Sequence, residues 1–180
     1  VFNPSNNSVL AKIPISSPEE LELAVQSASK AQREWSKVSI VKRADLILKL
    51  CSRIEDRAEE FALMDTYNAG NAITFARKDV LQAVANMKYF AGLVREVKGE
   101  TFSMKPKHLN FSRQQPYGVV LKINSFNRPF RWCAEKLAAP ILMGNAVIIK
   151  NSEQAPISSL KFCELLDGLF PDGLINVVTG

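Results

Sequence analysis

Apolar residues recur at helical spacing through most of the first 99 residues of this chain. The first such stretch opens on Ser17-Pro18-Glu19-Glu20, which combines an N-cap serine, a proline at the first helical position and a glutamate three residues after the cap. This pattern predicts a helix from residue 18, with one apolar face that packs against the core. The positions on that face are Leu21, Ala24, Val25, Ala28, Ala31 and Trp35.

A second helical stretch carries its apolar stripe from residue 44 to residue 54. We expect it to continue through Phe61 towards a break at residues 68–70, which read Asn-Ala-Gly. Cys51 belongs to the stripe, so we favour core packing over chemistry for this thiol. The stripe consists of Ala44, Ile47, Leu48, Cys51 and Ile54.

A third stretch places apolar residues at alternating steps of three and four, which is a heptad-like seam and predicts a long helix ending near residue 98. Such a seam fits either a coiled-coil partner or packing against neighbouring helices or a sheet, and we favour the packing. The seam consists of Ile73, Ala76, Val80, Ala83, Met87, Phe90 and Val94.

From residue 118 short apolar runs alternate with helical patterns. Residues 118–123, 145–150 and 174–179 predict strands, whereas residues 129–143 and 156–169 predict helices. The resulting β-α-β-α-β unit implies an α/β fold with a parallel sheet, the first half of a doubly wound, Rossmann-like architecture covered by the helical layer before it. Ligands of such sheets bind beyond the carboxyl ends of the strands, so functional residues should cluster at 123–127, 150–153 and 179–180.

Residues 100–117 separate the helical part from this unit and are polar and alternating, bounded by Pro116, which predicts an exposed strand or arm. Lys105, Lys107, His108 and Arg113 make the segment basic. Because basic side chains commonly protect exposed strands, we favour a solvated edge over an anion-binding patch.

Composition and charge narrow the class of protein. The chain has 180 residues, 47% of them hydrophobic and 23% charged, as in an ordinary globular protein. The net charge is +5, but residues 118–180 hold six basic and five acidic residues, so we expect no nucleic-acid binding.

Three distant cysteines without a close pair argue against a disulfide framework or a metal site and favour a reducing compartment. No apolar run approaches the roughly 20 residues of a membrane span, and a targeting segment before Val1 stays an open alternative.

Asn127 is the first candidate for chemistry. It follows the strand 118–123 and precedes a predicted helix, so its amide can face a ligand and donate a hydrogen bond to a developing oxyanion. An asparagine at this place is also a common turn or helix-cap residue, and the pattern alone leaves both interpretations open.

Lys150 and Glu153 are the second candidates, because they follow the strand 145–150. A lysine and a carboxylate there can hydrogen-bond the two hydroxyls of a ribose, and the carboxylate disfavours a 2′-phosphate. A strand-end turn in which Ser152 or Glu153 caps the next helix is compatible with this role. No GxGxxG motif follows the first strand, so the usual pyrophosphate-binding turn is missing from that place.

Several motifs occur together, in order, over essentially the whole chain. They are Asn3-Pro4, Gln115-Pro-Tyr-Gly-Val-Val120, Phe126-Asn127-x-Pro129, residues 136–145 (KLAAPILMGN), residues 147–156 (VIIKNSEQAP) and residues 170–180 (FPDGLINVVTG). With this set the chain resembles the amino-terminal portion of the aldehyde dehydrogenase superfamily. The resemblance implies oxidation of an aldehyde to a carboxylate through a cysteine thioester, with NAD or NADP as cofactor.

The resemblance also implies roles for individual residues. Asn127 matches the asparagine that helps to hold the oxyanion of the thiohemiacetal. Lys150 and Glu153 match residues that contact the adenosine ribose of the cofactor, and Ser152 lies in the same loop. The strand-end segment beside the cofactor is matched by Ile123, Ser125 and Phe126. The chain departs from the usual pattern at Ser125, Arg128 and Asn151, and Arg128 bears on the class of substrate.

In this family the cysteine nucleophile, the water-activating glutamate and the glycine-containing segment near the pyrophosphate lie downstream of residue 180. Cys133 lies on a predicted packing helix, and we reject it as the nucleophile. We therefore expect the isolated chain to be inactive and poorly soluble, and the parent enzyme to be a homo-oligomer, dimer or tetramer, in the cytoplasm or an organellar matrix. A non-catalytic fragment or a nucleotide-binding structural module is the alternative.

The expected organisation has three parts. Residues 1–99 form an arm and the helical layer of the cofactor-binding domain, residues 100–117 form a linker or oligomerisation arm, and residues 118–180 form the first half of the Rossmann-like unit. In the full enzyme this portion would supply the oxyanion donor and half of the cofactor site.

Overall fold

A three-stranded parallel sheet organises the fold. The structure, a computed structural model, describes residues 1–180. The strands β3 (Val119–Ile123), β4 (Ala146–Lys150) and β5 (Ile175–Val178) lie in the order β3-β4-β5. The central strand β4 is buried along Ala146 to Ile149, as its continuous apolar run requires. The β-α-β-α-β unit expected from the sequence is confirmed.

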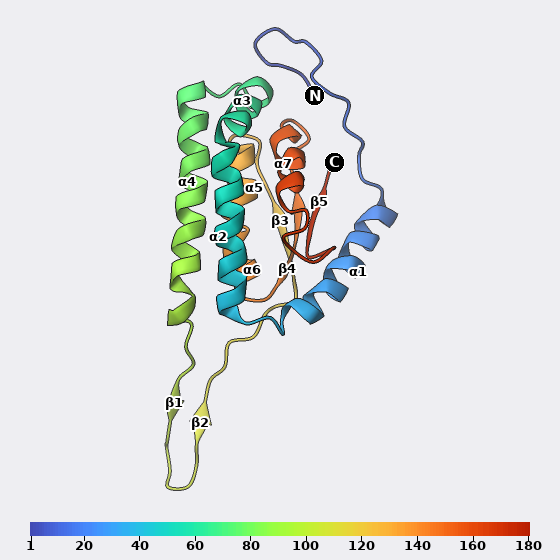
Figure 1. The fold of residues 1–180 in the computed structure, drawn as a ribbon. Coiled ribbons are helices and arrows are strands. Elements are labelled where there is room, and N and C mark those ends of the chain that lie inside the picture. Colours follow the sequence, from blue (N-terminus) through green and yellow to red (C-terminus); the bar gives the residue numbers. More distant parts are fainter.

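Helices cover both faces of this sheet (Figure 1). The helix α1 (Pro18–Trp35) contacts all three strands on one face. The other side holds α5 (Pro129–Glu135), α6 (Ala138–Leu142) and α7 (Ile157–Phe162). On these helices pack α2 (Ile40–Asp56), α3 (Ala58–Ala69) and α4 (Ile73–Gly92). Short 3-10 turns follow α4 at Leu93–Glu96 and α7 at Cys163–Leu165. Intramolecular packing therefore occupies the seam of α4, as we favoured.

The start of α1 matches its sequence signature. Ser17 accepts a hydrogen bond from the Glu20 N–H, and the Glu20 carboxylate accepts one from the Ser17 N–H, which is a complete capping box. The apolar face is buried only in its second half, because Leu21 and Val25 are more than 40% exposed. Our expectation that the whole face packs on the core was wrong for the first half of the helix.

Three helix predictions need correction. The second stretch is two helices, because the backbone leaves the helical region at Arg57 with φ −118° and ψ 19°. The stretch 129–143 divides after Glu135, since Pro140 has no N–H to donate to the Lys136 carbonyl. The stretch 156–169 is a regular α-helix only over α7. A separate correction concerns the α4 seam, because its Phe90 is 36% exposed.

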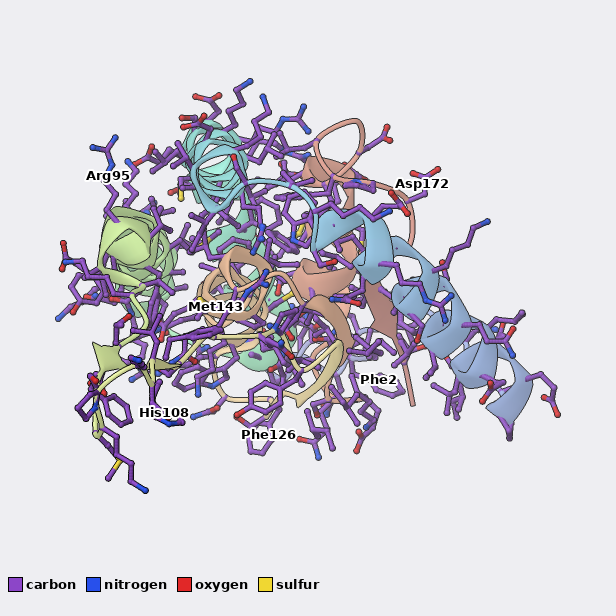
Figure 2. The ribbon with its side chains drawn as sticks, turned by 90° about the horizontal axis from the view of Figure 1, so that it is seen from below. Phe2, Arg95, His108, Phe126, Met143 and Asp172 are labelled. Atoms are coloured by element: carbon purple, nitrogen blue, oxygen red, sulfur yellow. The ribbon has the colours of Figure 1, made fainter.

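A thin hairpin projects from the body of the molecule between α4 and β3 (Figure 1). Its strands β1 (Thr101–Phe102) and β2 (Asn110–Phe111) pair antiparallel. Seen from below, His108 lies with the hairpin at one side of the molecule (Figure 2). The hairpin is exposed throughout, including Met104 at 78%. The expected exposed arm is thus confirmed, and it carries apolar as well as basic side chains.

One hydrophobic core joins the helices to the sheet. Trp35 is buried against Phe170 and its indole N–H donates to the Ile141 carbonyl at 2.9 Å. Phe130 packs between Phe61 and Phe162 with ring centroids at 4.4 and 6.0 Å. No helix is both long and apolar enough to cross a bilayer.

Candidate functional site

The register of the sheet brings the two candidate loops together. Ile123 pairs with Lys150 at the ends of β3 and β4, so the loops that follow these strands leave the same edge. The Asn124 N–H donates to the Lys150 carbonyl at 2.9 Å, and its side-chain amide donates to Asn151 Oδ1 at 3.3 Å. Asn124 and Asn151, both buried, therefore join the loops, although the sequence marked neither as a site residue.

The side chain of Asn127 is exposed and held by its carbonyl oxygen. Its Oδ1 accepts hydrogen bonds from Ser125 Oγ at 2.7 Å and from the Trp132 indole N–H at 3.0 Å. Both donors act on the oxygen, so the amide nitrogen Nδ2 points away with its two N–H groups free. Arg128 is the N-cap residue of α5, and no side chain caps it from that position. The cap role left open for Asn127 is therefore not the one that the structure shows.

Lys150, Ser152 and Glu153 lie together in the loop after β4. Lys150 Nζ is 3.5 Å from Glu153 Oε2, and Ser152 Oγ accepts from the Gln154 N–H at 3.3 Å. The pKa of the exposed Glu153 carboxyl is lowered by its own backbone N–H and then by the Lys150 charge, so it stays ionised at neutral pH. Ser152 shapes the turn, and the N-terminus of α7 is capped by a residue outside this loop.

Four of the seven candidate residues line two hollows, whereas Asn127, Lys150 and Ser152 line neither of them. Ile123 and Ser125 line one of about 270 Å³ together with Lys122, Asn124, Trp132 and Lys136. Phe126 and Glu153 line a second of about 500 Å³, which Phe2 and the end of α3 complete. Figure 2 shows Phe2 and Phe126 on the same side of the molecule. Asn127 lies in the segment that continues from Phe126 into α5.

The end of α3 supports both loops, which the sequence analysis missed. Asp65 Oδ2 accepts from the Phe130 N–H at 3.2 Å, and Asn68 Oδ1 accepts from the Ile157 N–H at 3.1 Å, so the two residues cap α5 and α7. The Asn71 amide donates to the Asn127 carbonyl at 3.0 Å. Asp65 and Asn68 are three residues apart on one face of α3, and Asn71 follows the Gly70 cap of that helix, so polar residues at steps of three were a signal available in the sequence.

Asp65 is a buried carboxyl with one unpaired oxygen. Burial raises the pKa of Asp65 to about 7, while the Ser158 hydroxyl and the Phe130 N–H oppose the shift and the Asp79 charge adds to it. Asp65 Oδ1 and Ser158 Oγ lie close enough to influence each other, yet neither has a formed hydrogen bond. The carboxyl is thus poorly compensated when it is ionised.

Lys122 is a second side chain with a shifted pKa, and it contacts Trp132, whose indole N–H holds Asn127. Its Nζ donates to the carbonyls of Trp132 and Cys133 at 2.8 and 3.3 Å, and burial lowers the pKa of Lys122 to about 8. The ammonium of Lys136 lies 4.6 Å from the centroid of the Trp132 ring. The Trp132 side chain, which holds Asn127 Oδ1, therefore has the positive charge of Lys136 over its ring face.

The cysteines have the environment of packing residues. Burial raises the pKa of the Cys133 thiol to about 12 and that of Cys51 to about 11, so neither forms a thiolate at neutral pH. Cys163 is half-buried, and burial raises its pKa as well. The rejection of Cys133 as a nucleophile agrees with this burial.

Comparisons with known proteins give one family. The sequence model of the aldehyde dehydrogenase family matches residues 1–180. The chain is 36% identical over 181 residues to a long-chain-aldehyde dehydrogenase of Acinetobacter, covering 99% of this chain. Two solved structures cover all of it: PnpE of Pseudomonas sp. WBC-3 in complex with NAD, at 34% identity and a TM-score of 0.96, and the NADP complex of glyceraldehyde-3-phosphate dehydrogenase GapN of Methanocaldococcus jannaschii, at 30% and 0.94.

The chain spans about a third of the length of these proteins. It covers 36% of the Acinetobacter enzyme, 37% of PnpE and 40% of GapN. The matched region contains the helical layer, the hairpin and the three strands described above.

Proposed function

Because this chain belongs to the aldehyde dehydrogenase family, we propose that it forms the amino-terminal part of an enzyme that oxidises an aldehyde to a carboxylate with NAD or NADP. In this proposal Asn127 donates to the oxyanion formed when a cysteine thiolate from outside residues 1–180 attacks the aldehyde. Lys150, Ser152 and Glu153, with Ile123, Ser125 and Phe126, belong to the cofactor site.

The observation that carries the proposal is the orientation of the Asn127 amide. Ser125 and Trp132 both donate to Oδ1, so they fix the side chain with Nδ2 free to donate outward. A donor that is held before the reaction begins pays no reorganisation when negative charge develops on the substrate oxygen. Since Ser125 and Trp132 bind only Oδ1, the arrangement supports a role for Nδ2 as a hydrogen-bond donor.

The residues of the β4 loop fit a nicotinamide cofactor. Lys150 and Glu153 offer one donor and one acceptor at a distance of 3.5 Å, and the diol of a ribose needs such a pair. A nicotinamide cofactor held by these residues would supply the two-electron oxidant that the reaction needs. Glu153 stays ionised, so it disfavours a 2′-phosphate and inclines the site towards NAD.

The organisation of the whole enzyme belongs to the same proposal. Residues 1–99 serve as the helical layer of the cofactor-binding domain, residues 118–180 as the first half of its sheet, and residues 100–117 as an arm that joins copies of the enzyme. The exposed apolar side chains of the hairpin support an arm that packs on another surface.

The test uses the full-length enzyme with Asn127→Ala and Asn127→Asp. The aspartate keeps an acceptor for Ser125 and Trp132 but loses the outward donor, so it separates donation from folding. Both variants should lower kcat on the order of a hundredfold or more, with little change in KM or Tm. Normal turnover combined with a Tm several degrees lower would show that Asn127 is a structural residue. If the unsubstituted enzyme forms no NADH or NADPH with any aldehyde, the non-catalytic alternative holds.

A further inference from the structure

Arg128 follows Asn127 directly and has an unusual environment for an arginine. Its guanidinium lies over the ring of Phe75, with Cζ 4.7 Å from the ring centroid. The side chain is 29% exposed, so it is neither buried nor free in solvent. The contact with the ring of Phe75 restrains the position of the guanidinium.

The charge of Arg128 is only weakly engaged within the chain. Its Nη1 is 3.4 Å from Asp79 Oδ1, and the two form no hydrogen bond, whereas Arg131 donates to the same oxygen at 3.0 Å. Arg131 also donates to Glu135 at 2.7 Å, so it is the main partner of both carboxylates. Arg128 thus forms an ion pair with Asp79 through Nη1 but donates no hydrogen bond within the chain, and part of its side chain faces solvent.

The surroundings of Asn127 carry an excess of positive charge. The charged side chains that contact Trp132, Asp79 or Arg131 are four basic and two acidic residues, so their formal net charge is +2. Arg131 and Lys136 both lie over the Trp132 ring, whose N–H holds Asn127. The members are Lys122, Arg128, Arg131, Lys136, Asp79 and Glu135.

We propose that Arg128 binds a carboxylate carried by the substrate, so that the enzyme acts on aldehydes with a second, acidic end. This inference rests on the proposed function and names its substrate class. A stacked guanidinium presents parallel N–H groups that match the two oxygens of a carboxylate. Because Arg128 is the next residue after the oxyanion donor, it would recognise the substrate from beside the reacting end. The remote carboxylate takes no part in the oxidation, and the product is a dicarboxylate.

The test compares two aldehydes with the same five-carbon chain on the full-length enzyme. We would measure kcat/KM for 5-oxopentanoate and for its uncharged methyl ester, with Arg128→Gln, Arg128→Lys and the control Arg77→Gln. Arg77 is an exposed arginine on the same helix as Asp79 and is paired with Glu59. We expect the enzyme to prefer the acid at least tenfold. Arg128→Gln should lower kcat/KM for the acid by 10- to 100-fold, through KM, and leave the ester and the KM for NAD nearly unchanged.

Arg128→Lys keeps a positive charge beside Asp79, so it guards against simple misfolding of the glutamine variant. It should recover only part of the selectivity, because lysine has no planar fork. Equal rates on acid and ester in the unsubstituted enzyme would overturn the inference. An equal loss on both substrates in Arg128→Gln would overturn it too, since Arg128 would then act as a structural partner of Asp79.

A binding measurement separates this inference from the proposed function. Calorimetry with succinate, glutarate and adipate reports on carboxylate recognition without turnover. Binding that depends on Arg128 supports the inference even if no aldehyde is oxidised, whereas absence of binding to all three overturns it. Loss of oxidation of both aldehydes with dicarboxylate binding intact would refute only the proposed function.

Discussion

Replacing Asp65 by asparagine should make the protein more stable at alkaline pH. The carboxyl is 2% exposed, and one of its oxygens has no partner. Asparagine has the same shape, keeps an acceptor for the Phe130 N–H and adds an amide that can donate to the unpaired Ser158 hydroxyl. The substitution therefore removes a buried charge and keeps the cap of α5.

The magnitude follows from the pKa of Asp65, which is about 7 instead of 3.8. Between these values the folded state holds a proton that the unfolded state has lost, so stability falls as the pH rises. The stability contributed by the protonated carboxyl is complete below about pH 4 and is lost as the pH rises through 7. Relative to the unsubstituted protein, Asp65→Asn should therefore gain about 2 to 3 kcal/mol between pH 5 and pH 8.5.

The assay is urea and thermal unfolding of both proteins at pH 5 and pH 8.5. Asp45→Asn, which alters an exposed aspartate of α2, serves as the matched control and should show no such pH-dependent gain. Amide exchange at Phe130 adds a local measurement, because its N–H should stay protected in Asp65→Asn. If Asp65→Asn loses stability equally at both pH values, the ionised carboxylate is required as the cap and the reasoning fails.

Three other substitutions or measurements test separate parts of the structure. Glu153→Gln should weaken NAD binding and relax discrimination against NADP in the full-length enzyme, and unchanged affinities for both cofactors would contradict the assignment. Gly173→Ala should cost on the order of 2 kcal/mol or more, because φ is 79° and the new Cβ would meet Ser27, whereas the control Gly168→Ala, with φ 63° and open space around it, should cost only about 1 kcal/mol. Cys133 should react with a thiol reagent only after unfolding, and rapid labelling of the native protein would disprove its burial.

The sheet could be predicted closely from the sequence because its signals are local. The run Ala146 to Ile149 is apolar without interruption, as a strand buried on both faces requires, and β4 occupies it. The capping box at Ser17 likewise fixes the start of α1 within four residues. Where neighbouring residues decide the structure, the pattern and the fold agree.

The interruptions and the supports of the site were harder to predict, because distant residues decide them. No glycine or proline marks the turn at Arg57, whose side chain pairs with Glu60 and with Glu164. The division of the stretch 129–143 does have a local signal, the proline at position 140. Asn127 was identified as a candidate, whereas the partners that orient its amide became visible only in three dimensions.

The caps supplied by α3 have a consequence for the order in which the molecule assembles. Asp65, Asn68 and Asn71 hold backbone groups that lie 65, 89 and 56 residues further along the chain. Such contacts close long loops, so they form late in folding, after local helices have appeared. During synthesis the helical layer emerges first, so Asp65 and Asn68 on α3, and Asn71 just after it, are made before the strand-end loops that they contact. The arrangement of the loops at this edge of the sheet is thus a late event of folding, and slow docking of α3 would leave the edge unformed while most of the secondary structure is already in place.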